Sequence, residues 1–356
     1  MKSPFLYIIP FALISLILGV MGGWIRLGWG FTIPSPVPVS QHGVFMVGGF
    51  LGTLVSLERV VTLYKKVLFL IPLSFGISVL FFLLGFPKIS NILLMSGSLA
   101  YLGVCIYIFK KYKNEGDLLL SFGAIFQLVG HYTLFQTQSY PMTFAAWMLF
   151  FLFTIIGERL ELTRFLPKKK FQKTELYFWL LILTLAAAFY HNGSSGILNI
   201  SMIGLAQWLI RNDISLINLK KKGSYKFLGI SLFSAFIWLI ITGLLGFLKG
   251  FLLYDALLHA FFIGFVLNMI LAHAPIIFPA LLKINHKPFH PVFYLWLTAL
   301  NLSLFMRILG DIFIINSLKM TGGLLNGLSF LGYLLTVGIL IIKHQIYEKN
   351  YKIRSI

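Results

Sequence analysis

Apolar residues recur along the chain in runs of about twenty, each long enough to cross roughly 30 Å of hydrocarbon as a helix. The runs are continuous in Leu, Ile and Phe and do not alternate with polar residues, which favours helices over the strands of a membrane barrel. We therefore predict spans near residues 4–28, 42–64, 67–86, 90–110, 116–136, 141–162, 174–192, 195–218, 225–247, 252–280, 291–314 and 321–344.

Composition agrees with this pattern, since 58% of the 356 residues are apolar and 11% are charged, against about 25% charged in an ordinary globular protein. No polar stretch is long enough for a soluble domain. The first apolar run extends to about Trp29, too long for the core of a signal peptide, so we interpret it as the first span. The prediction is an all-α polytopic membrane protein with about twelve spans, in which residues 1–356 form one integral-membrane domain.

The net charge of +19 comes from basic residues in the short loops between spans, so it indicates membrane topology and no nucleic-acid partner. Of the 29 Lys and Arg residues, 23 fall on the side of the N-terminus and two fall within spans. The other side holds only Arg26, Lys88, Lys249 and Lys319. This asymmetry predicts a multi-pass protein of the inner (cytoplasmic) membrane, embedded in lipid, with both termini in the cytoplasm.

Four of the eight histidines fall near the outer ends of four predicted spans: His42, His131, His191 and His259. Neutral imidazole is a common ligand for haem iron, copper and zinc, and several histidines in one layer suit a group held between helices. The alternative is that each histidine reaches the outer interface or bonds a neighbouring carbonyl. Cys105 lies within an apolar run and belongs to no thiol motif.

His42 and Met46 are one helical turn apart and share a face, which makes both candidate ligands of a cofactor. Gly49 and Gly52 lie close to that face and remove side-chain bulk below it. Small residues there would admit either a flat macrocycle or a neighbouring helix.

His259 has Asp255 one turn before it on the same face. A carboxylate bonded to the far nitrogen of an imidazole fixes its tautomer when the other nitrogen binds a metal. Asp255 is equally explained as a hydrated residue at the membrane interface.

Two arginines near the outer side could hold the propionates of a haem, Arg26 after the first span and Arg307 in the eleventh. For Arg307, an ion pair with Asp311 at i+4 is the alternative. Near the cytoplasmic ends two spans repeat a Glu-Arg pair, which suggests cross-helix ion pairs or a proton entry: Glu58-Arg59 and Glu158-Arg159.

These residues resemble the motifs of the NnrS family, twelve-span membrane proteins that contain haem and copper and are linked to nitric oxide stress. The second-span motif of that family matches here at His42, Met46, Gly49 and Phe50, although its second histidine and its glutamate are missing. A later motif matches at His259-Ala260, Gly264 and Met269, and further echoes are Gly157-Glu158-Arg159 and Met306-Arg307-Ile308-Leu309.

More remotely the chain resembles subunit I of the haem–copper oxidases, whose second and tenth helices supply the axial histidines of a low-spin haem. The resemblance implies a bundle of that type that holds haem b, with His42 and His259 as ligands, and that has copper as a candidate second metal. His131 and His191 could then supply a second metal. The oxidase motifs of the sixth and seventh helices are absent, so an oxygen-reducing pump is not expected.

The implied function is to bind, sense or detoxify nitric oxide or another small redox molecule. If the protein turns that molecule over, it would be a haem- or metal-dependent oxidoreductase that needs an electron donor. A secondary transporter is a second reading, because its sites lie at interrupted helices and Pro275, Pro279 and His273 could form one. A third is a membrane subunit without chemistry of its own that anchors a larger complex. An optical spectrum and metal analysis would separate these readings.

Overall fold

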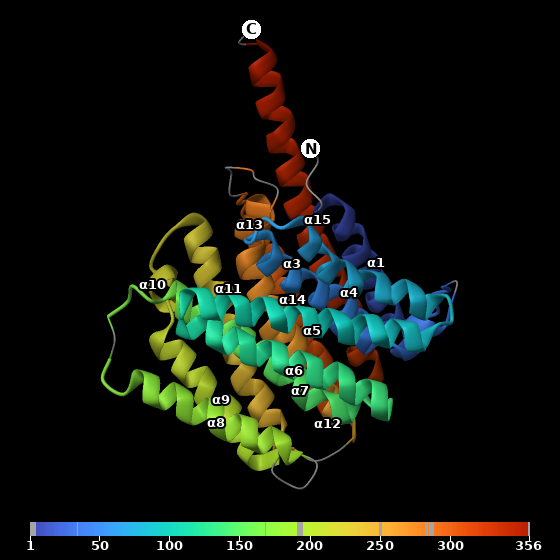
Figure 1. Cartoon of the computed structure of the whole chain (residues 1–356). Helices are drawn as coiled ribbons and strands as arrows, with labels where there is room; N and C mark the ends of the chain where they lie inside the picture. The colour runs from blue at the N-terminus through green and yellow to red at the C-terminus, as the bar shows by residue number, and fades with distance from the viewer. Residues whose placement is uncertain are drawn as a thin grey trace. The chain divides into compact units, whose positions relative to one another are not determined.

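The computed structural model describes residues 5–33, 35–167, 169–190, 195–248, 251–281, 284 and 288–354. All regular structure among these residues is helical, with short connections between consecutive helices (Figure 1). The chain divides into two compact units, which we call unit 1 (residues 1–170 and 181–195) and unit 2 (residues 171–180 and 196–356). That residues 1–356 form a single domain stays a prediction from the sequence.

Unit 1 begins with α1 (Phe5–Arg26) and a short α2 (Val37–Ser40). The next span starts at His42, runs through a π-helical stretch, η1 (Val44–Gly52), and continues as α3 (Thr53–Val61). Further helices follow: η2 (Lys66–Phe69), α4 (Leu70–Leu83), α5 (Pro87–Tyr112), α6 (Glu115–Thr137) and α7 (Tyr140–Leu162). Within this unit α1 and α4 pack on η1, and α6 packs on α7.

Unit 2 contains α9 (Ser195–Asn212), α10 (Ser215–Leu219) and α11 (Gly223–Leu245), while α8 (Gln172–Ala188) is divided between the two units. A second span with a π-helical stretch follows, built from α12 (Phe251–His259), η4 (Ala260–Leu267) and α13 (Asn268–Leu281). The helix continues through Pro275 and ends two residues after Pro279, so neither proline interrupts it. Two packed helices complete the unit, α14 (Val292–Ile312) and α15 (Asn316–Arg354).

Ten helical segments of the described chain are long and apolar enough to cross a membrane, and they coincide with ten of the twelve predicted spans. The remaining two predictions, 174–192 and 195–218, correspond to α8 and α9, helices of 17 and 18 residues that are not among the ten. The candidate spans in the described chain therefore number ten, not about twelve. Removing two consecutive spans leaves every other loop on its predicted side of the membrane.

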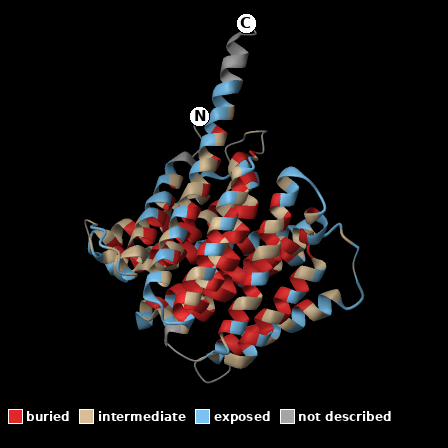
Figure 2. Ribbon diagram, turned by 180° about the vertical axis from the view of Figure 1, so that it is seen from behind, coloured by how far each residue is buried: buried red, intermediate tan, exposed pale blue. Residues whose placement is uncertain are grey.

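Many large apolar side chains are exposed on the helices, among them Leu99, Leu181, Leu302 and Leu335, each at least 60% exposed. Figure 2 shows some helices that are buried nearly all round and others on which buried and exposed residues alternate, so that the latter have an interior and an outward face. Outward leucines are expensive in water and suited to lipid. Together with the ten candidate spans, they indicate a multi-pass membrane protein.

Candidate functional site

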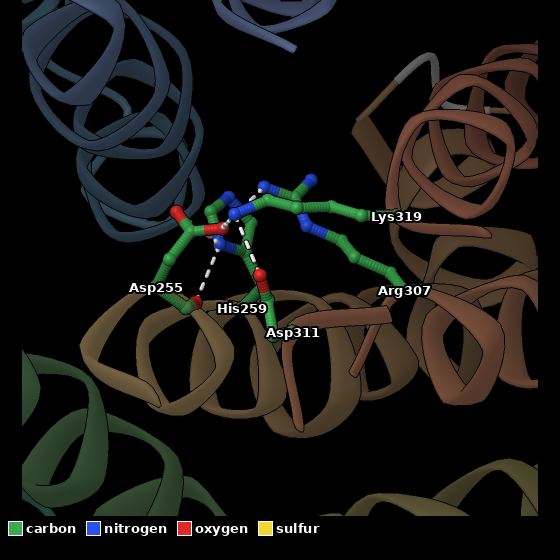
Figure 3. A network of polar contacts seen from close by, with 5 residues as sticks. All are labelled: Asp255, His259, Arg307, Asp311 and Lys319. Carbon is green, nitrogen blue, oxygen red and sulfur yellow. Dashed lines mark hydrogen bonds and ion pairs between the residues drawn. The ribbon is translucent and has the colours of Figure 1, made fainter. Parts of the chain in front are cut away.

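Five charged or titratable side chains meet in unit 2, and we call them the charge cluster: Asp255, His259, Arg307, Asp311 and Lys319. Asp255 and His259 come from α12, Arg307 and Asp311 from α14, and Lys319 from the first turns of α15. Figure 3 shows the long side chains of Arg307 and Lys319 reaching over to the Asp255 carboxylate.

Asp255 is the centre of the cluster. Its Oδ2 accepts a hydrogen bond of 3.0 Å from Arg307 and lies 3.3 Å from the Lys319 ammonium. Its Oδ1 lies 3.3 Å from Nδ1 of His259. Lys319 also lies 2.6 Å from Oδ1 of Asp311, so one lysine joins both carboxylates. Arg307 therefore pairs with Asp255 across helices, and the alternative partner Asp311 is taken by Lys319.

The α14–α15 hairpin brings these groups together. A Cβ atom at Gly322 of α15 would lie 2.6 Å from the main-chain nitrogen of Arg307, so α15 touches the α14 backbone there. Residue Ile314, in the turn between the helices, adopts a left-handed φ of 57°. This close crossing places Lys319 beside the α14 residues one turn apart, Arg307 and Asp311.

The cluster is partly buried: the side chain of Asp311 is 0% exposed and that of Arg307 is 9% exposed, whereas Asp255 at the centre is 32% exposed. Ionisable groups within membrane spans are expensive and commonly functional. Their charges balance here, because two carboxylates face the guanidinium and the ammonium. The arrangement can hold His259 in place and can exchange protons, and it is also a strong helix-to-helix clamp.

The His259 ring is fixed by its own helix. Its Nδ1 lies 2.8 Å from the main-chain oxygen of Asp255, and because a carbonyl only accepts, the ring nitrogen donates. The π-helical stretch η4 begins at the next residue, Ala260. In this tautomer Nε2 carries the lone pair, as metal-binding imidazoles require.

Below His259, η4 lies directly against α11. A Cβ atom at Gly264 would lie 2.5 Å from Cγ of Trp238, so this glycine admits a tryptophan of the neighbouring helix. The Trp238 indole donates to Asn301 of α14 at 2.6 Å, and Asn301 exchanges hydrogen bonds with Asn268 at the end of η4. This buried amide network ties three spans together.

His42 in unit 1 repeats the arrangement of His259. Its Nδ1 lies 2.7 Å from the main-chain oxygen of Gly19 in α1, and η1 begins two residues later. A Cβ atom at Gly23 would lie 3.0 Å from the His42 ring, and one at Gly19 would lie 2.7 Å from the Met46 sulfur. Histidine and methionine thus occupy the glycine face of α1. Arg26, one turn beyond Gly23, is exposed at the end of that helix.

The glycines below His42 serve helix packing. A Cβ atom at Gly49 would overlap Val79 of α4 and Ser15 of α1, and one at Gly52 would lie 3.1 Å from Phe75. The sequence left open whether these glycines make room for a flat macrocycle or for a neighbouring helix. In the structure they make room for neighbouring helices. The spaces beside them are filled by side chains of the same unit.

The remaining predicted metal ligands are His131 and His191. His131 of α6 is 2% exposed, its Nδ1 lies 2.7 Å from Ser98 Oγ, and its ring lies between those of Phe75 and Trp147. His191 lies outside the described residues. No three His, Cys, Asp or Glu side chains converge in the described part of the chain in a way that could hold a metal ion. His42 belongs to unit 1 and His259 to unit 2, so their convergence on one group stays a prediction.

A cross-helix ion pair joins the two Glu-Arg pairs in unit 1. Arg59 of α3 donates to Glu158 of α7 at 2.8 Å, with both side chains mostly buried. The sequence suggested either cross-helix ion pairs or a proton entry for these residues, and this contact is a cross-helix ion pair.

Sequence reasoning missed three members of these sites. Lys319 was interpreted as a loop residue, whereas it lies in the first turns of α15, within the charge cluster. Asn268 and Asn301 were not singled out, although an amide inside an apolar run is itself a signal, because an unpartnered amide in lipid is expensive. Their pairing could not be predicted, since 33 residues separate them.

No curated protein and no solved structure matches this chain. One family does match, over residues 5–342, and it carries only the description of a domain of unknown function. That match extends across both units and nearly all described helices. The chain belongs to this family, the domain of unknown function DUF8744.

Proposed function

We propose that the chain is a haem-binding membrane protein of the NnrS type in which His42 and His259 are ligands of the iron. One observation carries the proposal: each of these two histidines stands at the start of a π-helical stretch in a candidate span, with Nδ1 donating to a main-chain carbonyl at 2.7 or 2.8 Å. Such bonds fix the Nε2 tautomer of a ligating imidazole. Single π-helical stretches inside α-helices are common at functional sites.

The donor chemistry of the two histidines fits a haem iron, which two neutral imidazoles bind well. Arg26 suits a propionate, because it is exposed and lies on the α1 face that contacts the His42 ring. Arg307 suits one less well, since Asp255 already neutralises its charge. Asp255 would hold the far nitrogen of His259, and α8 and α9 would complete twelve spans of an oxidase-like bundle.

In that role the protein groups bind and orient. Gly19 O and the Asp255 carboxylate fix the two rings, and Met46 lies one turn from His42 against the same face of α1. Haem, when bound, supplies reversible electron transfer and a site for nitric oxide or a similar small molecule. Copper has less support, because no three His, Cys, Asp or Glu side chains in the described part of the chain are placed to hold a metal ion.

Optical spectroscopy of the protein purified from haem-replete cells tests the proposal. We expect a Soret band in the wild type that weakens or shifts from low-spin to high-spin in His42→Ala and in His259→Ala. His290→Ala is the matched control, because His290 is exposed and accepts a hydrogen bond from the nearby main-chain N–H of Val292. If one iron takes both histidines, either variant should give the same spectral shift. A haem-free wild type, or equal spectra in all three variants, would contradict the proposal.

The charge cluster supports a second candidate, an ion- or proton-coupled secondary transporter. Balanced buried charges inside spans are typical of ion pathways. A colourless preparation whose Asp255→Asn variant loses substrate or proton flux in liposomes would favour this reading. A subunit that anchors a partner complex would instead copurify with that complex and show neither property.

A further inference from the structure

Four buried side chains along the contact of α6 with α7 carry polar atoms that have no hydrogen-bond partner within the described protein. We call them the α6–α7 seam. None is more than 3% exposed. The atoms are Oγ1 of Thr154, Oε1 and Nε2 of Gln127, Nε1 of Trp147 and Nε2 of His131.

Glycines of α6 align these atoms. Gln127, Gly130 and His131 share one face of α6. A Cβ atom at Gly130 would lie 2.8 Å from the Trp147 indole nitrogen. The indole N–H therefore packs against the turn of α6 that carries Gln127 and His131. A Cβ atom at Gly123, one turn before Gln127, would lie 2.8 Å from Thr154 Oγ1. The side chains of Gln127 and His131 and the α7 atoms that contact Gly123 and Gly130 therefore lie along one face of α6, and the Gln127 amide nitrogen also lies 3.4 Å from a Cβ at Gly52 of η1.

The tautomer of His131 follows from its neighbour. The Ser98 hydroxyl has one hydrogen, which it donates to the main-chain oxygen of Leu94 at 2.8 Å. Ser98 Oγ must then accept from Nδ1 of His131, at 2.7 Å. Nε2 of His131 is consequently an acceptor, and it is buried without a donor among the residues that the structure describes.

Together these side chains present donors and acceptors without formal charge. The Trp147 indole and the Gln127 amide nitrogen donate, Gln127 Oε1 and His131 Nε2 accept, and the Thr154 hydroxyl does either. Burying all of these groups without hydrogen bonds would cost a desolvation free energy that is large relative to the net folding stability of a typical protein. Polar sites of this kind hold ordered water.

We propose that the α6–α7 seam is a water-binding site in which bound water bridges Gln127 and Trp147 and donates to His131 Nε2. This inference is independent of haem. The seam adjoins the start of the His42 span, because a Cβ atom at Gly43 would lie 3.5 Å from the Trp147 ring. It gives unit 1 a buried imidazole that is hydrogen-bonded to water and lies beside Trp147, whose ring contacts the residue after His42.

Synchrotron hydroxyl-radical footprinting of the full chain in lipid nanodiscs tests this site, since radicals formed from a bound water oxidise the aromatic ring beside it. Trp208 is the matched control, because it is 2% exposed and its indole donates to the Gln172 carbonyl at 2.8 Å. We expect Trp147 to be oxidised several-fold faster than Trp208. Gln127→Leu should slow the oxidation of Trp147 several-fold, whereas Gln207→Leu, at an exposed position of α9, should leave it unchanged.

A wild-type protein in which Trp147 is oxidised no faster than Trp208 would overturn the proposal, even if Gln127→Leu failed to fold. Metal analysis provides a second readout. Stoichiometric copper or zinc that disappears in His131→Phe would assign the seam to a metal and would equally overturn the assignment to water.

Discussion

Arg307 of α14 donates its hydrogen bond to Asp255 of α12, 52 residues away in the sequence, while Asp311, one turn along α14, is bound by Lys319 of α15. The two carboxylates thus hold three helices of unit 2 together through two cations. Because Arg307 and Lys319 each pair with a carboxylate on another helix, the hairpin of α14 and α15 forms part of the His259 site.

Asp311→Asn should lower the stability of the protein by about 3 kcal/mol, because it leaves the largely buried Lys319 ammonium without its closest carboxylate. Thermal unfolding in one fixed detergent measures the change. Glu175→Gln is the control: it breaks the half-exposed pair with Arg211, so its effect should stay below about 1 kcal/mol. Equal effects of the two variants would show that burial does not strengthen the Asp311 pair.

The single variant Lys319→Met should destabilise the protein. The double variant with Asp311→Asn should lose less stability than the sum of the two single losses. The reason is that the second substitution removes the charge that the first leaves unpaired. A double-mutant cycle on unfolding midpoints should give a coupling of about 1–3 kcal/mol for these contacting groups. Strict additivity would mean that the 2.6 Å contact between Lys319 and Asp311 contributes nothing.

Gly264→Ala should destabilise the protein by about 1–3 kcal/mol, because the new methyl group would lie 2.5 Å from Trp238 and force α11 away from η4. Gly338→Ala in α15 is the control, since no atom lies within 4 Å of a Cβ there. Alanine at an unstrained helical position should stabilise by about 0.4–1 kcal/mol. Opposite signs of the two shifts in unfolding midpoint are therefore expected, and a neutral Gly264→Ala would contradict the close packing.

Cysteine labelling with an impermeant reagent should place Lys111→Cys, Lys169→Cys and Lys221→Cys on one side of the membrane and Lys88→Cys on the other. Cys105 is the only cysteine and is buried, so Cys105→Ser gives a clean background. Two long helices separate position 111 from position 169 (α6 and α7), and two separate position 169 from position 221 (α8 and α9). Labelling of position 221 from the opposite side to position 169 would show that only one of α8 and α9 crosses.

Several elements follow from local sequence alone. The positions of ten candidate spans, and the pairing of Asp255 with His259 one turn apart, depend on run length and helical periodicity. The π-helical stretches after His42 and His259 could not be predicted, because apolar sequence fits α- and π-helix equally well. The roles of Gly49, Gly52 and Gly264 depended on which side chain fills each space.

The sequence by itself determined that this is a helical chain of apolar, span-length segments, because hydrocarbon thickness and backbone hydrogen bonding constrain each segment separately. It also marked His42, His259 and Arg307 as unusual, since polar groups in apolar runs need partners. Only the tertiary structure decided who those partners are. The choice of Asp255 for Arg307, of Lys319 for Asp311 and of Gly19 for His42 depends on how helices cross, and crossings are set by side-chain packing between segments far apart in the chain.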